Sequence, residues 1–466
     1  MRNTFYILAA LLLCFAPAAL PGGEARIVFT SDLHGELRSF AALTTAIKKH
    51  THDRTVTVDL GDTVSGNFDA EYAENSTGMA EALNLAGIRF WVPGNHDFEL
   101  ADANFRDFVK RFKGAALGGD WRKAGVSGMP YAFVETGGVR IAVIGLTDPK
   151  MPRRILPGSG MEFRDVRQVL REVLPEIRKA RPHLIVLAWH NGFYSILGPL
   201  GKFLKEFPEI GLVLGAHSHQ ENPGERVGGA LYVQAGAHAH AAGVVDIVTD
   251  DATGRVVKLS SFLIRPDAVH PDPEVTALAG RLRRSTAGLY HRKLGDFSPP
   301  LRQIGRNELD SRLGSLCAEA LMRCGRADAG IVFLPVTEYA TLERGVRCYG
   351  DLFRIIGHRD EVCSLIVTRD ELADFIREQR KLNRKFRRER ELFAAGIRLH
   401  RSPRGEVFGI DGPSPLRLAV SDYQICASQV LRPLVDRPER KFVRTGILVR
   451  DAAATLMNER SQHRHE

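Results

Sequence analysis

Short apolar runs alternate with amphipathic stretches over the first half of the chain. Within the runs, hydrophobic residues are continuous, which is typical of strands buried on both faces of a sheet. The intervening segments 40–49 and 166–179 have helical periodicity. This pattern predicts a layered α/β domain. The runs interpreted as strands are residues 27–29, 56–58, 90–92, 141–144, 184–187 and 212–214, followed by 231–233, 244–248 and 256–264.

The length of 466 residues exceeds what one hydrophobic core usually supports. We therefore expect a first domain over 25–265, a polar connecting helix over 270–293 and a second domain over 294–451. Residues 452–466 are interpreted as a frayed polar tail.

Two helices are expected in the second domain. The apolar residues between Leu313 and Cys324 recur at helical spacing. Thr368 and Glu371 form a candidate capping box for another helix, whose outer face is strongly basic. Because no aromatic platform accompanies that face, we interpret it as solvated and expect no specific nucleic-acid binding.

Composition narrows the class of protein without naming a substrate. With 44% hydrophobic and 26% charged residues, the chain is neither disordered, nor collagen-like, nor a polytopic membrane protein. The net charge of +9 is compatible with an anionic partner, but it does not identify which anion binds. The oligomeric state is not predicted.

Residues 1–22 have the pattern of a secretory signal peptide. Arg2 is followed by an apolar stretch from Phe5 to Phe15 that is too short to span a bilayer. No later apolar run is long enough either, so we expect no transmembrane span and a periplasmic or secreted protein. Two alternatives to cleavage stay open. The segment could remain as an uncleaved anchor, or a lipid could be attached at Cys14, although Leu13 stands where a lipoprotein box needs a small residue.

The other five cysteines lie in the last third of the chain. Export permits disulfides, but an odd count leaves one thiol unpaired. Cys348 and Cys363 are one candidate disulfide pair. The alternative, to which we give equal weight, is that these cysteines are buried thiols that pack as small hydrophobic residues.

Five strand-end loops carry metal-ligand side chains. Strand ends of layered α/β folds converge on one crevice, so donors far apart in sequence can meet there. A single histidine beside a strand is usually structural, but five such loops in succession are not a coincidence. The segments are Asp32-Leu33-His34, Asp59-Leu60-Gly61-Asp62, Asn95-His96-Asp97-Phe98-Glu99, His190-Asn191 and His217-Ser218-His219.

These donors suit two divalent ions. Carboxylate, imidazole and amide groups without thiolate accept Mn, Zn, Fe or Co. If the loops are extended, residues i and i+2 point the same way, which lets Asp32 and His34 hold one ion. We assign Asp32, His34 and His219 to one ion, Asn95, His190 and His217 to the other, and both carboxylate oxygens of Asp62 to a bridge between them.

The remaining histidines are less informative. His238 and His240 follow a predicted strand and are candidates for groups that support the ligands. We interpret the others as structural, namely His50, His52, His183, His291 and His358.

These motifs resemble the signature of calcineurin-like metallophosphoesterases. Their order, followed by a connecting helix and a distinct second domain, is similar to the bacterial periplasmic 5′-nucleotidase family. The resemblance implies a four-layer αββα domain and a smaller α/β C-terminal domain. It also implies two metal ions held by the seven ligands above, and hydrolysis of a small phosphoester by in-line attack of a metal-bridging hydroxide.

The same resemblance implies a catalytic dyad. His96 matches the family histidine, and Glu99 stands where the family usually has aspartate. Protonated His96 would stabilise the transition state and the leaving oxygen. Glu99 would orient His96, with neighbouring Asp97 as the alternative partner.

The second domain departs from the family pattern. Leu334 to Tyr339 replace an Asn-Gly-Gly-x-x-Arg segment, Ile356 to Asp360 replace Pro-Phe-Gly-Asn, and Ser421-Asp422-Tyr423-Gln424 lacks the glycine run that follows in relatives. Phe408 and Tyr423 are candidate base-stacking groups, although we favour core positions for both.

We therefore expect an exported hydrolase of phosphomonoesters such as nucleotides. The alternatives are a related hydrolase acting on 2′,3′-cyclic nucleotides or sulfur esters, and a non-catalytic metal- or partner-binding protein.

Overall fold

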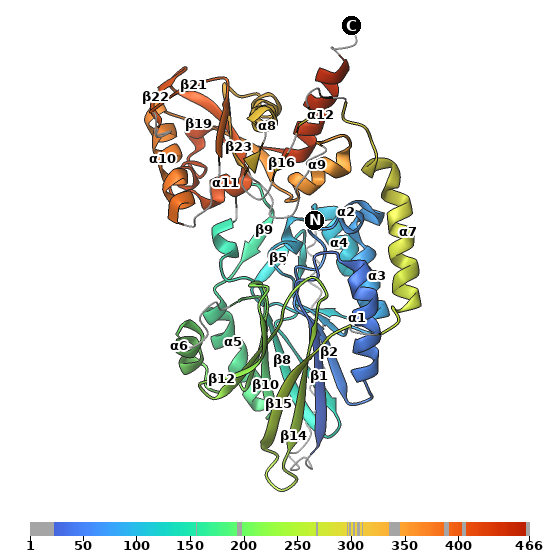
Figure 1. Cartoon of the computed structure of the whole chain (residues 1–466). Coiled ribbons are helices and arrows are strands. Elements are labelled where there is room, and N and C mark those ends of the chain that lie inside the picture. Colours follow the sequence, from blue (N-terminus) through green and yellow to red (C-terminus); the bar gives the residue numbers. More distant parts are fainter. Residues whose placement is uncertain are drawn as a thin grey trace, which may run out of the picture.

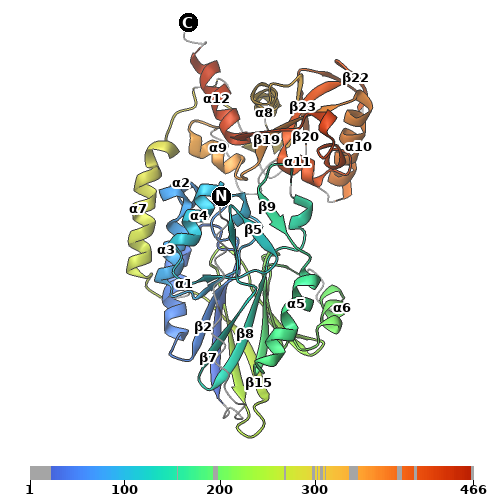
Figure 2. The ribbon, with the colours of Figure 1, turned by 180° about the vertical axis from the view of Figure 1, so that it is seen from behind.

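A computed structural model describes most of the chain between residues 23 and 462. Figures 1 and 2 show two domains one above the other, with helix α7 (Pro273–Tyr290) alongside them. The predicted leader with Cys14, and residues 335–339 of the altered family motif, lie outside the described residues. The described residues are 23–154, 156–192, 198–266, 269–295, 297, 300–301, 303–304, 308–309, 311–334, 345–385, 391–402 and 407–462.

The first domain is built on two six-stranded sheets. In the first sheet β1 pairs in parallel with β2 and antiparallel with β14. In the second sheet β10 pairs in parallel with both β8 and β11. The first sheet has the order β15 (Val256–Ile264), β14 (Ala242–Thr249), β1 (Glu24–Thr30), β2 (Thr55–Asp59), β3 (Phe90–Trp91), β4 (Ala115–Ala116). The second has the order β12 (Glu221–Val227), β13 (Ala230–Ala235), β11 (Leu212–Gly215), β10 (Leu184–Trp189), β8 (Val139–Leu146), β7 (Tyr131–Thr136).

The two sheets pack face to face between layers of helices (Figure 1). In β1, Ile27 and Phe29 enter the core between the sheets, whereas Val28 packs under the helices. Burial on both faces explains the continuous apolar runs, and the predicted αββα arrangement is confirmed. The helices over the first sheet are α1 (Leu37–His50), α3 (Gly78–Leu85), α4 (Asp102–Arg111) and α7, and those over the second are α5 (Val166–Lys179) and α6 (Pro199–Glu206).

The second domain has a five-stranded sheet that is also covered on both faces. Val332 and Val362 pack toward one layer of helices, while Phe333 and Cys363 pack toward the other. The strand order is β20 (Glu391–Ala395), β18 (Ala329–Leu334), β23 (Leu416–Ser421), β19 (Glu361–Val367), β24 (Val443–Leu448). The first layer holds α8 (Ser311–Cys324), α9 (Tyr349–Ile355) and α12 (Val449–Gln462), and the second holds α10 (Arg369–Lys385) and α11 (Asp422–Ala427).

Shorter elements complete the fold. A three-stranded sheet lies between the domains (Figure 1), and two hairpins belong to the second domain. These elements are α2 (Phe68–Tyr72), β6 (Val126–Ser127), β5 (Trp121–Lys123), β9 (Met161–Phe163), β16 (Gln303–Ile304), β17 (Glu308–Leu309), β21 (Arg398–Arg401), β22 (Val407–Asp411), and the 3₁₀ turns η1 (Glu74–Ser76), η2 (Asp97–Glu99), η3 (Met151–Arg154), η4 (Arg432–Leu434) and η5 (Pro438–Arg440).

Both helices predicted in the second domain form. Helix α8 buries Leu313 and Leu321, as its periodicity predicts. At the start of α10 the Thr368 backbone N–H donates to Glu371 at 2.8 Å, and the Glu371 N–H donates to the Thr368 hydroxyl at 3.2 Å. The predicted capping box is confirmed.

The C-terminal end of the second domain differs from expectation. The tail predicted from residue 452 is wrong, because most of it belongs to α12, which buries Ala453 and Met457 in the core. The polar run from Asn458 onward gave this segment a polar appearance, but Ala453 and Met457 belong to an apolar stripe on the helix. The other domain boundaries stay predictions.

Helix α7 connects the domains through both of its ends. Asp272 caps the helix by accepting from the N–H groups of Glu274 and Val275 at 3.1 Å each. Val275 and Leu282 enter the core of the first domain, so this helix is not simply polar. Tyr290, its last residue, packs against the core of the second domain.

The five cysteines of the second domain are free thiols. The disulfide considered between Cys348 and Cys363 is therefore not present, and Cys363 is buried in the core. Within the described part of the chain, no helix has the length and apolar character needed to span a membrane.

Candidate metal centre and active site

The loops that carry the predicted ligands have a constrained backbone. The φ angles of Asp32, His34, Asp62, His217 and His219 lie between 48° and 70°. Left-handed φ is uncommon outside glycine and concentrates at functional sites. The extended Asp-x-His segment expected from the sequence is therefore wrong, although Asp32 and His34 still point toward the same place.

Asp32, His34 and His219 form the first ligand group. Nε2 of His34 lies 3.1 Å from Nε2 of His219, and Nε2 of His219 lies 3.6 Å from Oδ1 of Asp32. The other nitrogen of His34, Nδ1, lies 2.8 Å from the carbonyl oxygen of Ser65. Since that contact needs the proton on Nδ1, Nε2 is left with a lone pair for a metal ion.

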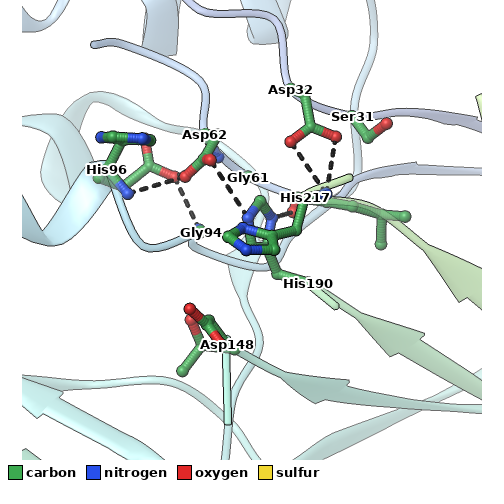
Figure 3. Close-up of polar contacts among 12 residues, drawn as sticks. Ser31, Asp32, Gly61, Asp62, Gly94, His96, Asp148, His190 and His217 are labelled. Carbon is green, nitrogen blue, oxygen red and sulfur yellow. Dashed lines mark hydrogen bonds and ion pairs between the residues drawn. The ribbon is translucent and has the colours of Figure 1, made fainter. Parts of the chain in front are cut away.

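Asp62, His190 and His217 form the second group (Figure 3). Nδ1 of His190 donates to the carbonyl oxygen of Leu60 at 2.5 Å. Its Nε2 atom is buried, makes no hydrogen bond to any described residue, and lies 3.3 Å from Oδ2 of Asp62. This buried nitrogen faces a carboxylate, so it must either carry a proton itself or share a cation with Asp62.

Asp62 lies between the two groups. Its Oδ2 atom is 3.3 Å from Nε2 of His190 and 4.0 Å from Nε2 of His34. Its Oδ1 atom accepts the backbone N–H of His96 at 2.8 Å. Oδ2 therefore faces both groups, and the bridge through both oxygens stays a prediction.

Asn95 joins the second group through its amide. One amide atom of Asn95 lies 2.7 Å from Nδ1 of His217, and the other lies 3.0 Å from Arg154. With nitrogen toward His217 the amide donates to the ring. With oxygen there and no proton on Nδ1, two acceptors face each other, an arrangement that a cation bound to both would stabilise.

The charges in the cage also fit cations. Burial raises the pKa of Asp32 to about 7, with neighbouring Asp62 adding to the effect. Burial also lowers the pKa of His34 to about 3 and that of His217 to about 4, so both rings are neutral. Burial alone would lower the pKa of His190, but Asp62 and Asp32 raise it to about 10. The carboxylates thus demand positive charge in the cage, and the donors fit a pair of divalent ions.

Gly94 brings the two ligand loops together. A Cβ atom at this position would lie 2.3 Å from Oδ1 of Asp62 and 2.5 Å from Cε1 of His190. Neither neighbour is free to move without displacing a candidate ligand, so only glycine fits here.

His96 and Glu99 form the predicted pair. Nδ1 of His96 lies 2.7 Å from Oε1 of Glu99. Burial works to lower the pKa of His96, but Glu99 and Asp62 outweigh it and raise the pKa to about 10. The ring therefore carries a proton at neutral pH.

Asp97 is not an alternative partner for His96. Its carboxylate accepts backbone N–H groups of Asp62, Thr63 and Gly94 at 2.8–2.9 Å. It thereby ties two ligand loops together. Asp59 has a similar role, since it accepts the Thr30 and Thr63 hydroxyl groups at 2.7 and 2.9 Å.

Three further histidines lie at different distances from the cage, and His358 differs from its sequence interpretation. The ring of His238 lies 5.1 Å from that of His34, and the backbone N–H of His238 donates to the Asp32 carbonyl oxygen at 2.8 Å. His240 lies farther out, 6.2 Å from His238 between ring centres. His358, interpreted as structural, lies against His96 with 5.9 Å between ring centres.

A cleft of about 1080 Å³ opens beside the cage between the domains. Asn95, Glu99 and Arg154 line it from the first domain, and Arg359 and Tyr423 from the second.

The preference for core positions at the two candidate aromatic residues is wrong. Tyr423 is 48% exposed and lines the cleft, whereas Phe408 is 74% exposed on β22.

Comparisons with known proteins agree with this geometry. The calcineurin-like phosphoesterase family matches residues 25–221. Endonuclease YhcR of Bacillus subtilis is 23% identical over 76% of this chain, and the snake venom 5′-nucleotidase of Naja atra is 22% identical over 58%. The aligned regions cover only 32% and 59% of those two relatives.

A solved structure shows the same fold over nearly the whole chain. The 5′-nucleotidase precursor of Thermus thermophilus superimposes with a TM-score of 0.67 at 18% identity, covering 94% of this chain and 97% of the other. Residues 25–221 thus match the calcineurin-like phosphoesterase family, within a chain that has the two-domain fold of the 5′-nucleotidase precursor.

Proposed function

We propose that this chain is an exported dinuclear-metal phosphoesterase that hydrolyses phosphomonoesters, with nucleotides as the first candidate substrates. The observation that carries the proposal is the meeting of two ligand groups on Oδ2 of Asp62, which lies 3.3 Å from Nε2 of His190 and 4.0 Å from Nε2 of His34. The leader over residues 1–22 supports export.

Seven residues would hold the two ions. Bound there, the ions would supply Lewis-acid stabilisation of a phosphoryl oxygen and lower the pKa of a water molecule. One group consists of Asp32, His34 and His219, the other of Asn95, His190 and His217, with Asp62 shared.

His96 is proposed as the proton donor in the reaction. Its protonated ring would stabilise the charge of the transition state and deliver a proton to the leaving oxygen. Glu99 holds the proton on Nδ1, which leaves the Nε2 proton for the substrate. Arg154, on the cleft wall beside Asn95, supplies a positive charge for the phosphate group.

The substrate class is tested with a panel of esters and added manganese. The panel contains p-nitrophenyl phosphate, nucleoside monophosphates, cyclic nucleotides, dinucleotides, sugar phosphates and a thiosulfate conjugate. We expect release of phosphate that a chelator abolishes and manganese restores, with about two metal ions bound per chain. Two bound ions without turnover of any ester would instead favour a binding protein.

Replacement of Glu99 by glutamine tests the role of His96. Because Glu99 raises the pKa of His96, its loss should lower that pKa. Protonated His96 is then lost at lower pH, so the alkaline limb of the kcat/KM profile should move down by about one pH unit or more. An unchanged limb, measured with p-nitrophenyl phosphate from pH 5 to 10, would contradict a proton-donor role for His96.

A further inference from the structure

A histidine of the second domain lies flat against the proposed proton donor. The rings of His358 and His96 are 5.9 Å apart between centres and inclined by only 20°. His34 contacts the same ring edge-on, with 5.5 Å between centres and an angle of 65°. His96 is thus contacted from the ligand cage and from the other domain.

Two arginines hold the loop that carries His358. Arg359, next in the chain, donates to the carbonyl oxygen of Glu99 at 3.3 Å and to Oε2 of Glu71 at 3.1 Å. Arg450 forms an ion pair with the same Glu71 oxygen at 2.5 Å, and neither side chain is exposed to solvent. Its Nη1 atom also donates to the carbonyl oxygens of Gly357 and His358 at 3.0 and 3.2 Å.

This arrangement fixes His358 relative to the first domain. Glu71 belongs to α2 of the first domain, while Arg359 and Arg450 belong to the second. The loop is therefore attached to the first domain directly through Arg359, which bonds to the backbone of Glu99, and indirectly through Arg450, which pairs with Glu71. The stack on His96 adjoins a hydrogen-bonded connection between the domains, whose Glu71–Arg450 pair is buried.

We propose that His358 is a positioning residue for His96, an inference that rests on the function proposed above. One hydrogen bond from Nδ1 to Glu99 leaves the His96 ring free to tilt about that bond. A flat ring packed against its face removes this freedom and directs Nε2 toward the reacting oxygen. The second domain thereby completes the catalytic geometry through a ring contact.

Steady-state kinetics of His358 variants test the proposal with p-nitrophenyl phosphate and manganese. His358→Ala should lower kcat about tenfold and leave KM within about twofold, because the proton donor and not substrate binding is disturbed. His358→Phe keeps a flat ring and should retain kcat within about threefold.

A matched control separates this effect from the loss of any histidine in the domain. His400 lies on the β21–β22 hairpin, where its Nε2 is 2.7 Å from Asp411, and His400→Ala should leave both constants unchanged. Unchanged kcat in His358→Ala, or an equal loss in His358→Phe, would overturn the stacking role.

A measurement without turnover keeps the contact testable if no ester is hydrolysed. NMR spectra are recorded on the zinc-loaded full chain with isotope-labelled histidines. The ring signal of His96 is identified because it is lost in His96→Gln. His358→Ala should shift this signal, whereas His400→Ala should not.

The two kinds of failure can be told apart. If the wild-type chain has no activity but His358→Ala shifts the His96 signal, the contact is supported and the proposed function is refuted. If the wild-type chain is active, and His358→Ala keeps full activity and does not shift the His96 signal, only the positioning role is refuted.

Discussion

Replacement of Asp62 by asparagine is expected to lower kcat/KM for p-nitrophenyl phosphate on the order of a thousandfold or more. The amide has the same shape and can still accept the His96 N–H at the position of Oδ1. It lacks the negative charge on the oxygen that faces both His190 and His34. Two cations would then repel each other without a shared anion, so bound metal should also fall below two ions per chain.

Asp53→Asn is the matched control for this substitution. The Asp53 side chain is 91% exposed, and its contacts are with neighbouring His52 and Arg54. This variant should keep wild-type kinetics and metal content. Retention of most activity by Asp62→Asn would exclude the dinuclear mechanism, whatever metal the protein holds.

Replacement of Arg450 by methionine is expected to lower the free energy of unfolding by about 3–5 kcal/mol. The substitution leaves the buried Glu71 carboxylate with Arg359 as its remaining ion-pair partner. It also removes the donors to Tyr72 and to the carbonyl oxygens of Gly357 and His358. Urea unfolding followed by circular dichroism measures the loss, because that signal reports both domains.

A surface ion pair provides the comparison. Arg171 is 65% exposed and lies 3.4 Å from Glu206, so Arg171→Met should change stability by about 0.5 kcal/mol or less. If Arg450→Met unfolds at the same urea concentration as this control, the ion pair does not join the domains. Intrinsic fluorescence adds detail, since Trp91, Trp121 and Trp189 all lie in the first domain.

Much of the first domain could be predicted because its signals are local. The apolar runs of β1, β2 and β10 reflect burial on both faces, and each is followed directly by donor side chains. Ends of neighbouring parallel strands lie together, so proximity of the donors followed from the strand assignments alone. All seven predicted ligands come together for this reason.

The details of the cage could not be predicted because they depend on backbone geometry. Left-handed φ angles at Asp32 and Asp62 are set by contacts between loops, such as the N–H of Asp32 bonded to the Gly61 carbonyl oxygen at 2.8 Å. The same holds for Asp97, whose sequence position next to His96 suggested a partner and whose carboxylate instead binds three backbone N–H groups.

The contribution of the second domain was missed for a different reason. Arg359 contacts Glu99 across 260 positions of sequence, and His358 has no neighbouring motif that marks it. Only the relative placement of the two domains reveals such a contact. The exposure of Tyr423 on the cleft wall likewise follows from the domain arrangement.

Helix α7 limits where the polypeptide can be divided. Val275, Leu278 and Leu282 are part of the first domain's interior, and Gly78 of α3 has no room for a Cβ beneath Leu282. A fragment ending near residue 270 would leave an apolar groove open to water and should aggregate. A fragment that retains the chain through Tyr290 keeps the groove filled. It is the shortest fragment that we expect not to aggregate on its own.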